Sequence, residues 1–176
     1  NPDEVIVVVG YMREKIISYI DTNYADAFHI KYVVQEQQHG LGHAIQVTKE
    51  AVGDSPIMIA LGDMIFQDGY SEFLKQHRCN GSCSGSIGVK TIDNPEHYGI
   101  VYYNKDQTVR RLVEKPKDSS SRTGIAGVYF IEDTPALFRA LDAMASEGRG
   151  GEVQLTDALQ KAVEQGSVYR TFEVNS

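Results

Sequence analysis

Short apolar runs alternate with amphipathic segments along the first third of the chain. Val5–Val9, Ile30–Val34 and Ile57–Leu61 lack polar alternation, which is typical of strands buried on both faces of a sheet. Apolar residues recur at helical spacing from Tyr11 to Ile20, and His43–Val52 has a helical pattern as well. The order strand, helix, strand, helix, strand predicts a mostly parallel sheet with helices on its faces.

The second half of the chain mixes both periods. Tyr98–Tyr103 and Thr108–Val113 alternate in the strand period around a polar tetrapeptide, which predicts a hairpin and therefore a mixed sheet. Pro135 stands in the first turn of one expected helix, and Gly166 follows the last turn of another. The remaining expected elements are helices at Gly69–Arg78, Thr134–Ser146 and Glu152–Gln165 and strands at Ser86–Lys90, Ile125–Ile131 and Val168–Val174.

A carboxylate follows the apolar run Ile57–Leu61 directly. Gly62 allows a tight turn or the close approach of a ligand, and Asp63 then stands at the carboxyl end of the strand, the edge where open α/β sheets bind ligands. Asp63 is a candidate ligand of a divalent metal. The alternative is that Asp63 only caps the next helix or turn.

Composition limits the partners. The 176 residues are 41% hydrophobic and 23% charged, which suits one soluble globular domain, and the net charge of −7 argues against nucleic acid or a membrane surface as a partner. No apolar run approaches the roughly 20 residues of a membrane span. Cys79 and Cys83 lie near His77, but no second pair completes a zinc site, so we expect free thiols and a cytoplasmic protein.

Several segments together resemble the sugar-1-phosphate nucleotidylyltransferases, of the glucose-1-phosphate uridylyltransferase or thymidylyltransferase type. Gln35-x4-Gly40-Leu41-Gly42-His43-Ala44 resembles their base-recognition loop, and Leu61-Gly62-Asp63 their metal-binding strand end. Three further segments resemble their sugar pocket, and one the opening of a family helix: Tyr98-Gly99-Ile100-Val101, Glu114-Lys115-Pro116, Ala126-Gly127-Val128-Tyr129 and GEVQLTDAL from Gly151. The segments occur in the family's order over nearly the whole chain.

The resemblance implies a three-layer α/β/α Rossmann-like fold with a mixed, mostly parallel sheet. It implies nucleotidyl transfer from UTP or dTTP to a hexose-1-phosphate, with Mg²⁺ held in part by Asp63 as the catalytic and metal-binding residue. Gln35, Gly40 and Gly62 would then bind the nucleotide. The sugar would contact Tyr98, Gly99, Glu114, Lys115, Gly127 and Tyr129.

Each of these assignments has a plainer alternative. Gln35 could be only a polar strand end, and Glu114 with Lys115 a surface ion pair. Gly99 and Gly127 could mark bulges or tight bends, and Tyr129 suits the core as well as a ligand contact. For the whole chain, the alternative is a non-catalytic nucleotide-sugar-binding or regulatory module with the same fold. A phosphotransfer enzyme of another family would need a Walker-type loop, and the sequence has none.

Two family segments are missing from these 176 residues. One is the initial strand with its GxGTR-type phosphate loop, and the other carries a second metal-binding Asp. We therefore expect a single nucleotidyltransferase domain over residues 1–176 that is truncated at both ends. A missing first strand would leave Val5–Val9 beside an open edge, so we expect a homo-oligomer. The choice between UTP and dTTP, and the identity of the sugar, stay open.

The first testable prediction concerns activity. The 176-residue chain alone will show little or no transferase activity, because the phosphate loop and one metal carboxylate are missing. Pyrophosphate release with UTP or dTTP and glucose-1-phosphate measures this. Robust turnover by the isolated chain would contradict the truncation.

Overall fold

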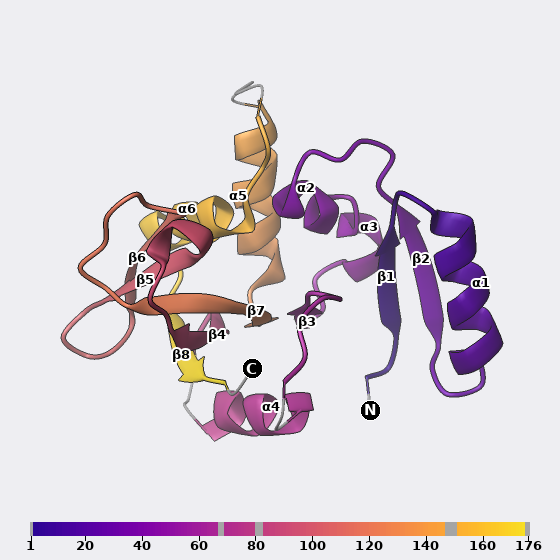
Figure 1. Cartoon of the computed structure of the whole chain (residues 1–176), viewed down its shortest axis with the longest axis horizontal. Helices are drawn as coiled ribbons and strands as arrows, with labels where there is room; N and C mark the ends of the chain where they lie inside the picture. The colour runs from indigo at the N-terminus through magenta and orange to yellow at the C-terminus, as the bar shows by residue number, and fades with distance from the viewer. Residues whose placement is uncertain (1, 67–68, 80–82, 147–150, 175–176) are drawn as a thin grey trace.

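The computed structural model describes residues 2–66, 69–79, 83–146 and 151–174 (Figure 1). The strands are β1 Val5–Val9, β2 Ile30–Val34, β3 Ile57–Ala60, β4 Gly85–Thr91, β5 Gly99–Tyr103, β6 Val109–Glu114, β7 Thr123–Ile131 and β8 Tyr169–Glu173. The helices are α1 Arg13–Tyr24, α2 Leu41–Gln46, α3 Lys49–Val52, α4 Gly69–Cys79, α5 Thr134–Ser146, α6 Leu155–Glu164 and the 3-10 turn η1 Pro95–His97. Every predicted strand and helix is therefore present, and β1, β2 and α5 have the predicted bounds, whereas the ends of the others are shifted.

The larger sheet is built around β7. Its strands follow the order β6-β5-β7-β4-β8, and β3 pairs with the second half of β7. The predicted hairpin is β5–β6. The mixed sheet is confirmed, but β7 runs opposite to β3, β4 and β5, so β4–β8 is the parallel pair of this sheet and the other pairings are antiparallel. The strand directions are mostly the same, since β3, β4, β5 and β8 run one way and β6 and β7 the other. Most neighbouring strands of this sheet are nevertheless antiparallel.

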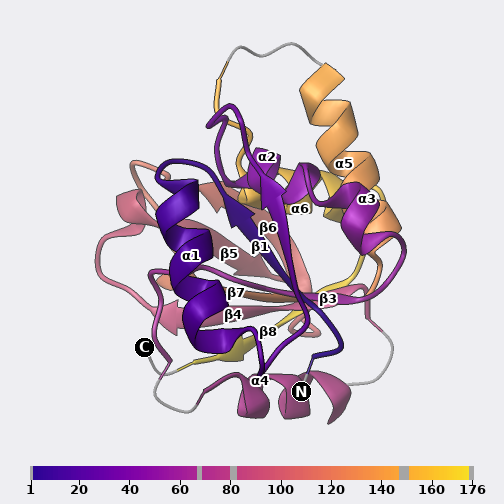
Figure 2. The same ribbon diagram turned by 90° about the vertical axis from the view of Figure 1, so that its right-hand side faces the viewer.

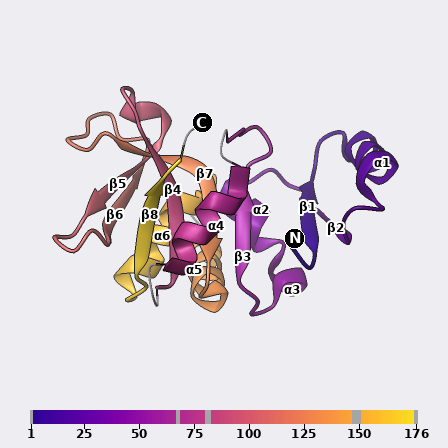
Figure 3. The same cartoon turned by 90° about the horizontal axis from the view of Figure 1, so that it is seen from below.

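Helices cover both faces of the larger sheet. Figure 1 shows α5 and α6 on one side and α4 on the other, and Figure 3 shows α4 crossing the opposite face. The core lies mainly between the sheet and the α5–α6 pair, where Ile87, Ile131, Leu137, Leu141 and Leu159 are fully buried. This three-layer arrangement matches the predicted fold class.

β1 and β2 form a separate parallel pair in register from Val5–Ile30 to Val9–Val34. Within the described residues, β1 pairs only with β2 and β3 only with β7, and the unpaired edges of β1 and β3 face each other, because β1 lies between β3 and β2 (Figures 1 and 3). Figure 2 shows α1 and β2 in front of the larger sheet. The prediction that Val5–Val9, Ile30–Val34 and Ile57–Leu61 are buried on both faces is wrong here, and in β2 Lys31 and Val34 are exposed. β1 is half-buried except at Val9, and Met58 and Ala60 of β3 are exposed, because nothing among the described residues covers these edges.

Three helix boundaries differ from the prediction for backbone reasons. Met12 has φ 57°, a left-handed conformation, so α1 begins at Arg13 instead of Tyr11. The helix predicted at His43–Val52 is two short helices that break at Val47–Thr48, and α2 begins earlier, at Leu41. α6 begins at Leu155 because Gln154 is extended.

Other predicted features fall at loops. Gly166, with φ 102°, follows α6 as a C-terminal glycine, and its amide donates to the Val163 carbonyl. The sequence also predicts a turn at Asn80–Ser84 and a glycine-rich connector at Gly148–Gly151, and both lie largely outside the described residues. The described helices include none that is both long and apolar enough to span a bilayer.

The open edges generate a second prediction. The chain will self-associate as its concentration rises, because unpaired strand edges recruit other strands. Met58→Lys on β3, where the side chain is 37% exposed, will weaken this association, since a charge at an edge strand opposes pairing. Sedimentation velocity over a concentration series measures it. Tyr19→Lys on the exposed face of α1 is the control, and a strictly monomeric wild type at high concentration would contradict the prediction.

Candidate active site

The first part of the site is the loop that follows β2. The side-chain amide nitrogen of Gln35 donates to the Gly40 carbonyl at 3.2 Å and lies 3.0 Å from Nδ1 of His43. Gln35 is half-buried and folds over its own loop, so it is more than a polar strand end. The side chain is therefore held in one place before any ligand arrives.

Two glycines let this loop meet the segment before α6. The Gly42 amide donates to the Val153 carbonyl at 2.7 Å, and the Val153 amide donates to the His39 carbonyl at 2.8 Å. Gly40 has φ 89°, and a Cβ there would lie 2.8 Å from the Val153 carbonyl oxygen. A Cβ on Gly42 would meet Val153 at 2.7 Å. Both positions thus require glycine.

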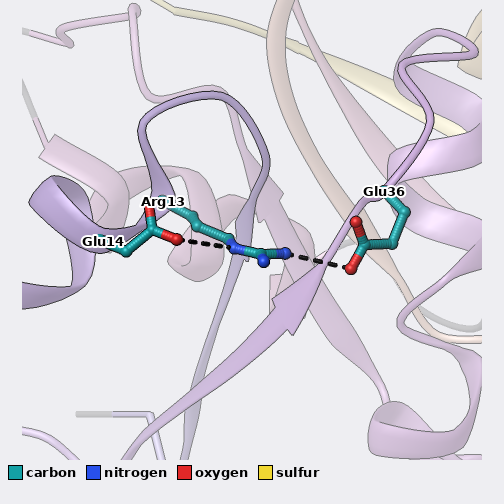
Figure 4. A network of polar contacts seen from close by, with 3 residues as sticks. All are labelled: Arg13, Glu14 and Glu36. Atoms are coloured by element: carbon teal, nitrogen blue, oxygen red, sulfur yellow. Dashed lines mark hydrogen bonds and ion pairs between the residues drawn. The ribbon is translucent and has the colours of Figure 1, made fainter.

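An ion-pair network fastens the start of α1 to the same loop. Arg13 donates from Nη1 to Glu36 and from Nε to Glu14, each at 3.1 Å (Figure 4). Hydrogen bonds to Glu14 and then Glu36 hold the pKa of Arg13 above its ordinary value. All three side chains are substantially exposed, so the pair fixes geometry more than it adds stability.

Asp63 lies in the turn that follows β3. The Leu61 amide donates to the Gly127 carbonyl and the Met64 amide to the Leu61 carbonyl, each at 3.2 Å. The Asp63 carboxylate is exposed and makes no hydrogen bond or ion pair with the part of the chain that the structure describes. Within the described residues, the side chain of Asp63 therefore shows no capping hydrogen bond.

Gly127 of β7 packs against the turn that carries Asp63. It has φ 81°, and the pairing of β4 with β7 shifts register between Ile87 and Val89, so β7 is bulged at this point. A Cβ on Gly127 would lie 3.0 Å from Leu61 and 3.1 Å from Met64. The bulge alternative is thus correct for Gly127, and the bulge supports the Asp63 turn. Gly62 has open space around its Cα.

Asp63 is the carboxylate that the sequence motifs suggest as a metal ligand. Among the described residues, no group of three His, Cys, Asp or Glu side chains gathers as a ligand set, and His77 with Cys83 forms none. An unpaired carboxylate at a strand end still fits Mg²⁺, which commonly takes one or two carboxylates and completes its shell with phosphate oxygens and water.

The second part of the site gathers at the β5–β6 hairpin. Gly99 pairs with Glu114 across the two strands, and a Cβ on Gly99 would lie 2.7 Å from Oγ1 of Thr156 and 3.2 Å from Oε2 of Glu114. Lys115, with φ 42°, turns back so that its amide donates to the Tyr98 carbonyl at 3.0 Å. Its ammonium lies 3.7 Å from Glu114 and is exposed.

The two tyrosines predicted for the sugar pocket differ in environment. Tyr98 is half-buried, and the ammonium of Lys90 lies 5.3 Å from its ring centroid. Tyr129 is 3% exposed in β7, between Ile59 and Ile87, so the core alternative is the correct one for its ring. Burial, and then the charge of Glu114, raise the pKa of the Tyr129 hydroxyl. Tyr129 is therefore a core residue close enough to Glu114 to sense its charge.

The structure adds two residues that the motifs did not single out. His43 contacts the Gln35 amide, and Thr156, in the first turn of α6, lies close against Gly99. The sequence placed both inside quoted motifs, but only the fold brings Thr156 to the hairpin. We call Gln35–Ala44 the base loop, after the family segment that it resembles, and Glu152–Thr156 the connecting segment. The connecting segment contacts the base loop at one end and the β5–β6 hairpin at the other.

Two other features do not belong to this site. His77 lies 2.7 Å from Ser86 and 3.3 Å from Glu132, a set that resembles a hydrolase triad, but Ser86 is fully buried and no substrate can reach its hydroxyl. A surface hollow of about 430 Å³ lies on the exposed side of α1 and includes none of the predicted site residues.

Residues 1–176 match the family model described as Nucleotidyl transferase. The chain belongs to this family. The bifunctional protein GlmU of Methanococcus maripaludis is 33% identical over 170 residues, which are 95% of this chain and 38% of that protein. The UTP–glucose-1-phosphate uridylyltransferase AglF of Haloferax volcanii is 30% identical over 175 residues, 98% of this chain and 70% of that protein.

Solved structures show the same fold. A UDP-glucose pyrophosphorylase in complex with UDP-glucose has a TM-score of 0.74 at 21% identity, over 98% of this chain and 74% of that one. The resemblance to the nucleotidylyltransferases and the Rossmann-like fold are therefore confirmed. The chain spans about 38% of the length of the GlmU relative.

The close approach of the base loop to Val153 generates a third prediction. Gly42→Ala will lower the free energy of unfolding by about 1–3 kcal/mol, because the new methyl group would press against the Val153 backbone. Urea denaturation followed by circular dichroism measures this. Gly151→Ala, which has open space around it, is the matched control, and equal stability of the two variants would contradict the contact.

Proposed function

We propose that the protein containing this chain transfers a nucleotidyl group from UTP or dTTP to a hexose-1-phosphate, probed first with glucose-1-phosphate. The products are a nucleotide-diphospho-sugar and pyrophosphate. The observation that carries the proposal is the connecting segment, which joins a preformed amide-and-glycine loop to a carboxylate-lined hairpin. A base-binding loop and a sugar-binding hairpin that contact the same short segment suit two substrates that must be aligned for in-line attack.

The base would be bound by Gln35 with the backbone of Gly40. Uracil and thymine present an N–H flanked by two carbonyl oxygens, so they need one acceptor and nearby donors. The Gln35 amide supplies the acceptor, and the glycine loop allows close backbone approach. Gly62, open on all sides, would let the nucleotide pass beside the Asp63 turn.

The sugar would be bound by the hairpin. Glu114 can accept hydrogen bonds from hydroxyl groups, and Lys115 can donate to hydroxyl or phosphate oxygens. Gly99 and Gly127 carry no side chain that would occupy the space of the sugar, and Tyr98 would contact the sugar. Tyr129 lies in the core near Glu114. The chemistry fits a hexose without choosing among glucose, N-acetylated and manno sugars.

Asp63 would hold Mg²⁺ together with oxygens of the triphosphate. The bound ion would neutralise charge on the α-phosphate and the leaving pyrophosphate. The residues of this chain would orient the base and the sugar so that a phosphate oxygen attacks the α-phosphorus in line, and no covalent enzyme intermediate is needed.

The name of the Haloferax volcanii relative supports UTP and glucose-1-phosphate as first substrates. We propose further that residues 1–176 are one domain, that the phosphate loop and a second carboxylate lie elsewhere in the complete gene product, and that the protein is cytoplasmic and oligomeric. The GlmU relative, of which this chain spans 38%, is consistent with additional segments.

A second candidate is a binding module that recognises a nucleotide sugar without turnover. It is favoured by the single available carboxylate at the strand end, since the described residues hold no metal cluster of three ligands. Turnover by the complete gene product separates the two candidates.

The fourth prediction follows from the exposed carboxylate of Asp63. In the complete gene product, Asp63→Asn will lower kcat/KM by about 100-fold and raise the Mg²⁺ concentration needed for half-maximal rate, because a neutral amide is a weaker ligand. A pyrophosphate assay over a panel of nucleotides and sugar phosphates measures both.

Asp54→Asn, at the other end of β3, is the matched control and will keep wild-type activity. An Asp63→Asn enzyme with an unchanged rate and magnesium dependence would rule out the metal role. A wild-type enzyme that binds nucleotide sugars without turnover would favour the module.

A further inference from the structure

The two hydrogens of the Gln35 amide are both committed inside the protein. The Gly40 carbonyl can only accept, so the group 3.2 Å from it must be the NH₂ end of Gln35. The same carbonyl also accepts from the Ala44 amide at 3.1 Å, which completes its two lone pairs. The orientation of the Gln35 amide is therefore not arbitrary.

The same NH₂ group faces His43. Nδ1 of His43 lies 3.0 Å from Nε2 of Gln35, so it must accept the second amide hydrogen. An imidazole that accepts at Nδ1 carries its proton on Nε2. Gly40 and His43 together therefore fix which end of the Gln35 amide points into the protein.

One group of the amide remains for a ligand. With both hydrogens used, Gln35 presents the oxygen Oε1, which can only accept. Uracil and thymine carry a donor at N3, whereas cytosine carries a lone pair there, which would face Oε1 without a hydrogen. Oε1 of Gln35 and N3 of cytosine would then both be acceptors without a hydrogen between them. The free-energy cost of leaving both groups unpaired disfavours the binding of cytosine more than a poor steric fit would.

We propose that His43 is a positioning residue that selects uracil and thymine against cytosine by holding the Gln35 amide with its oxygen toward the base. The inference rests on the proposed function for its ligand. His43 lies in α2, and the first turn of that helix is fixed by the hydrogen bond from Gly42 to Val153. The ring is half-buried and does not need to touch the nucleotide itself.

His39 provides a matched comparison in the same loop. Its ring centroid lies 5.2 Å from that of His43, and its side chain is exposed. His39 holds the loop through its backbone carbonyl, which a side-chain substitution keeps. A change at His39 therefore tests imidazole loss without touching the Gln35 amide.

The tautomer is measured directly on the 176-residue chain. Two-bond ¹H–¹⁵N correlation spectra at a pH where the ring is neutral will show His43 with an unprotonated Nδ1. A protonated Nδ1 would overturn the proposal, because that nitrogen could not accept from Gln35.

The selectivity is measured on the complete gene product with UTP and CTP as substrates. His43→Leu will reduce the preference for UTP over CTP in kcat/KM by about tenfold, through KM for UTP instead of kcat. His43→Asn will restore most of the preference, because its side-chain oxygen can accept from Gln35 at the position of Nδ1. His39→Leu will keep the wild-type preference.

The outcomes separate the two proposals. If the wild type uses UTP over CTP and His43→Leu keeps the full preference while it stays folded by circular dichroism, the positioning role is wrong and the proposed function stands. If His43→Asn and His43→Leu lose preference equally, the hydrogen bond is not the cause and the proposal also falls. If the wild type turns over neither UTP nor dTTP, the proposed function fails and the selectivity falls with it.

Discussion

The structure depends on the meeting of the base loop with the connecting segment. Two backbone hydrogen bonds, from Gly42 to Val153 and from Val153 to His39, join residues more than a hundred positions apart. This contact is possible because neither Gly40 nor Gly42 carries a side chain toward Val153. The loop after β2 is thereby fixed relative to α6, and α6 packs on the core of the larger sheet.

A second backbone device plays the same part on the other side of the site. The bulge of β7 at Gly127 brings its carbonyl to the Leu61 amide and leaves room for the turn that carries Asp63. Thr156 of α6 approaches Gly99 in the same manner, at a position without a Cβ. The polar groups of the site are thus placed by close backbone approaches, with few side-chain contacts among them.

Sequence patterns predicted the elements well because their signals are local. The strand ends of Val5–Val9 and Ile30–Val34 and the bounds of Thr134–Ser146 agree with the structure. The patterns could not predict that Met58 and Ala60 would be exposed, because a strand's burial depends on neighbours that periodicity does not report. The break between α2 and α3 was also missed, since the sequence there is helical throughout.

The motifs name candidate site residues, but they do not show how these residues lie relative to one another. The motifs named Gln35, Asp63 and Glu114, yet Tyr129 lies in the core and Gly127 serves a bulge. His43 lies eight residues from Gln35 and Thr156 lies far along the chain from Gly99, and only the fold shows that each pair is close in space.

The separate pairing of β1 with β2 has a consequence for how specificity can diverge. The Gln35 loop leaves β2, whereas Glu114 and Lys115 lie on and just after β6 of the larger sheet. Among the described residues, the connecting segment contacts both regions. Under the proposed function, substitutions that alter the choice of base and those that alter the choice of sugar therefore fall on different structural units. A lineage could then exchange one preference while it inherits the other unchanged.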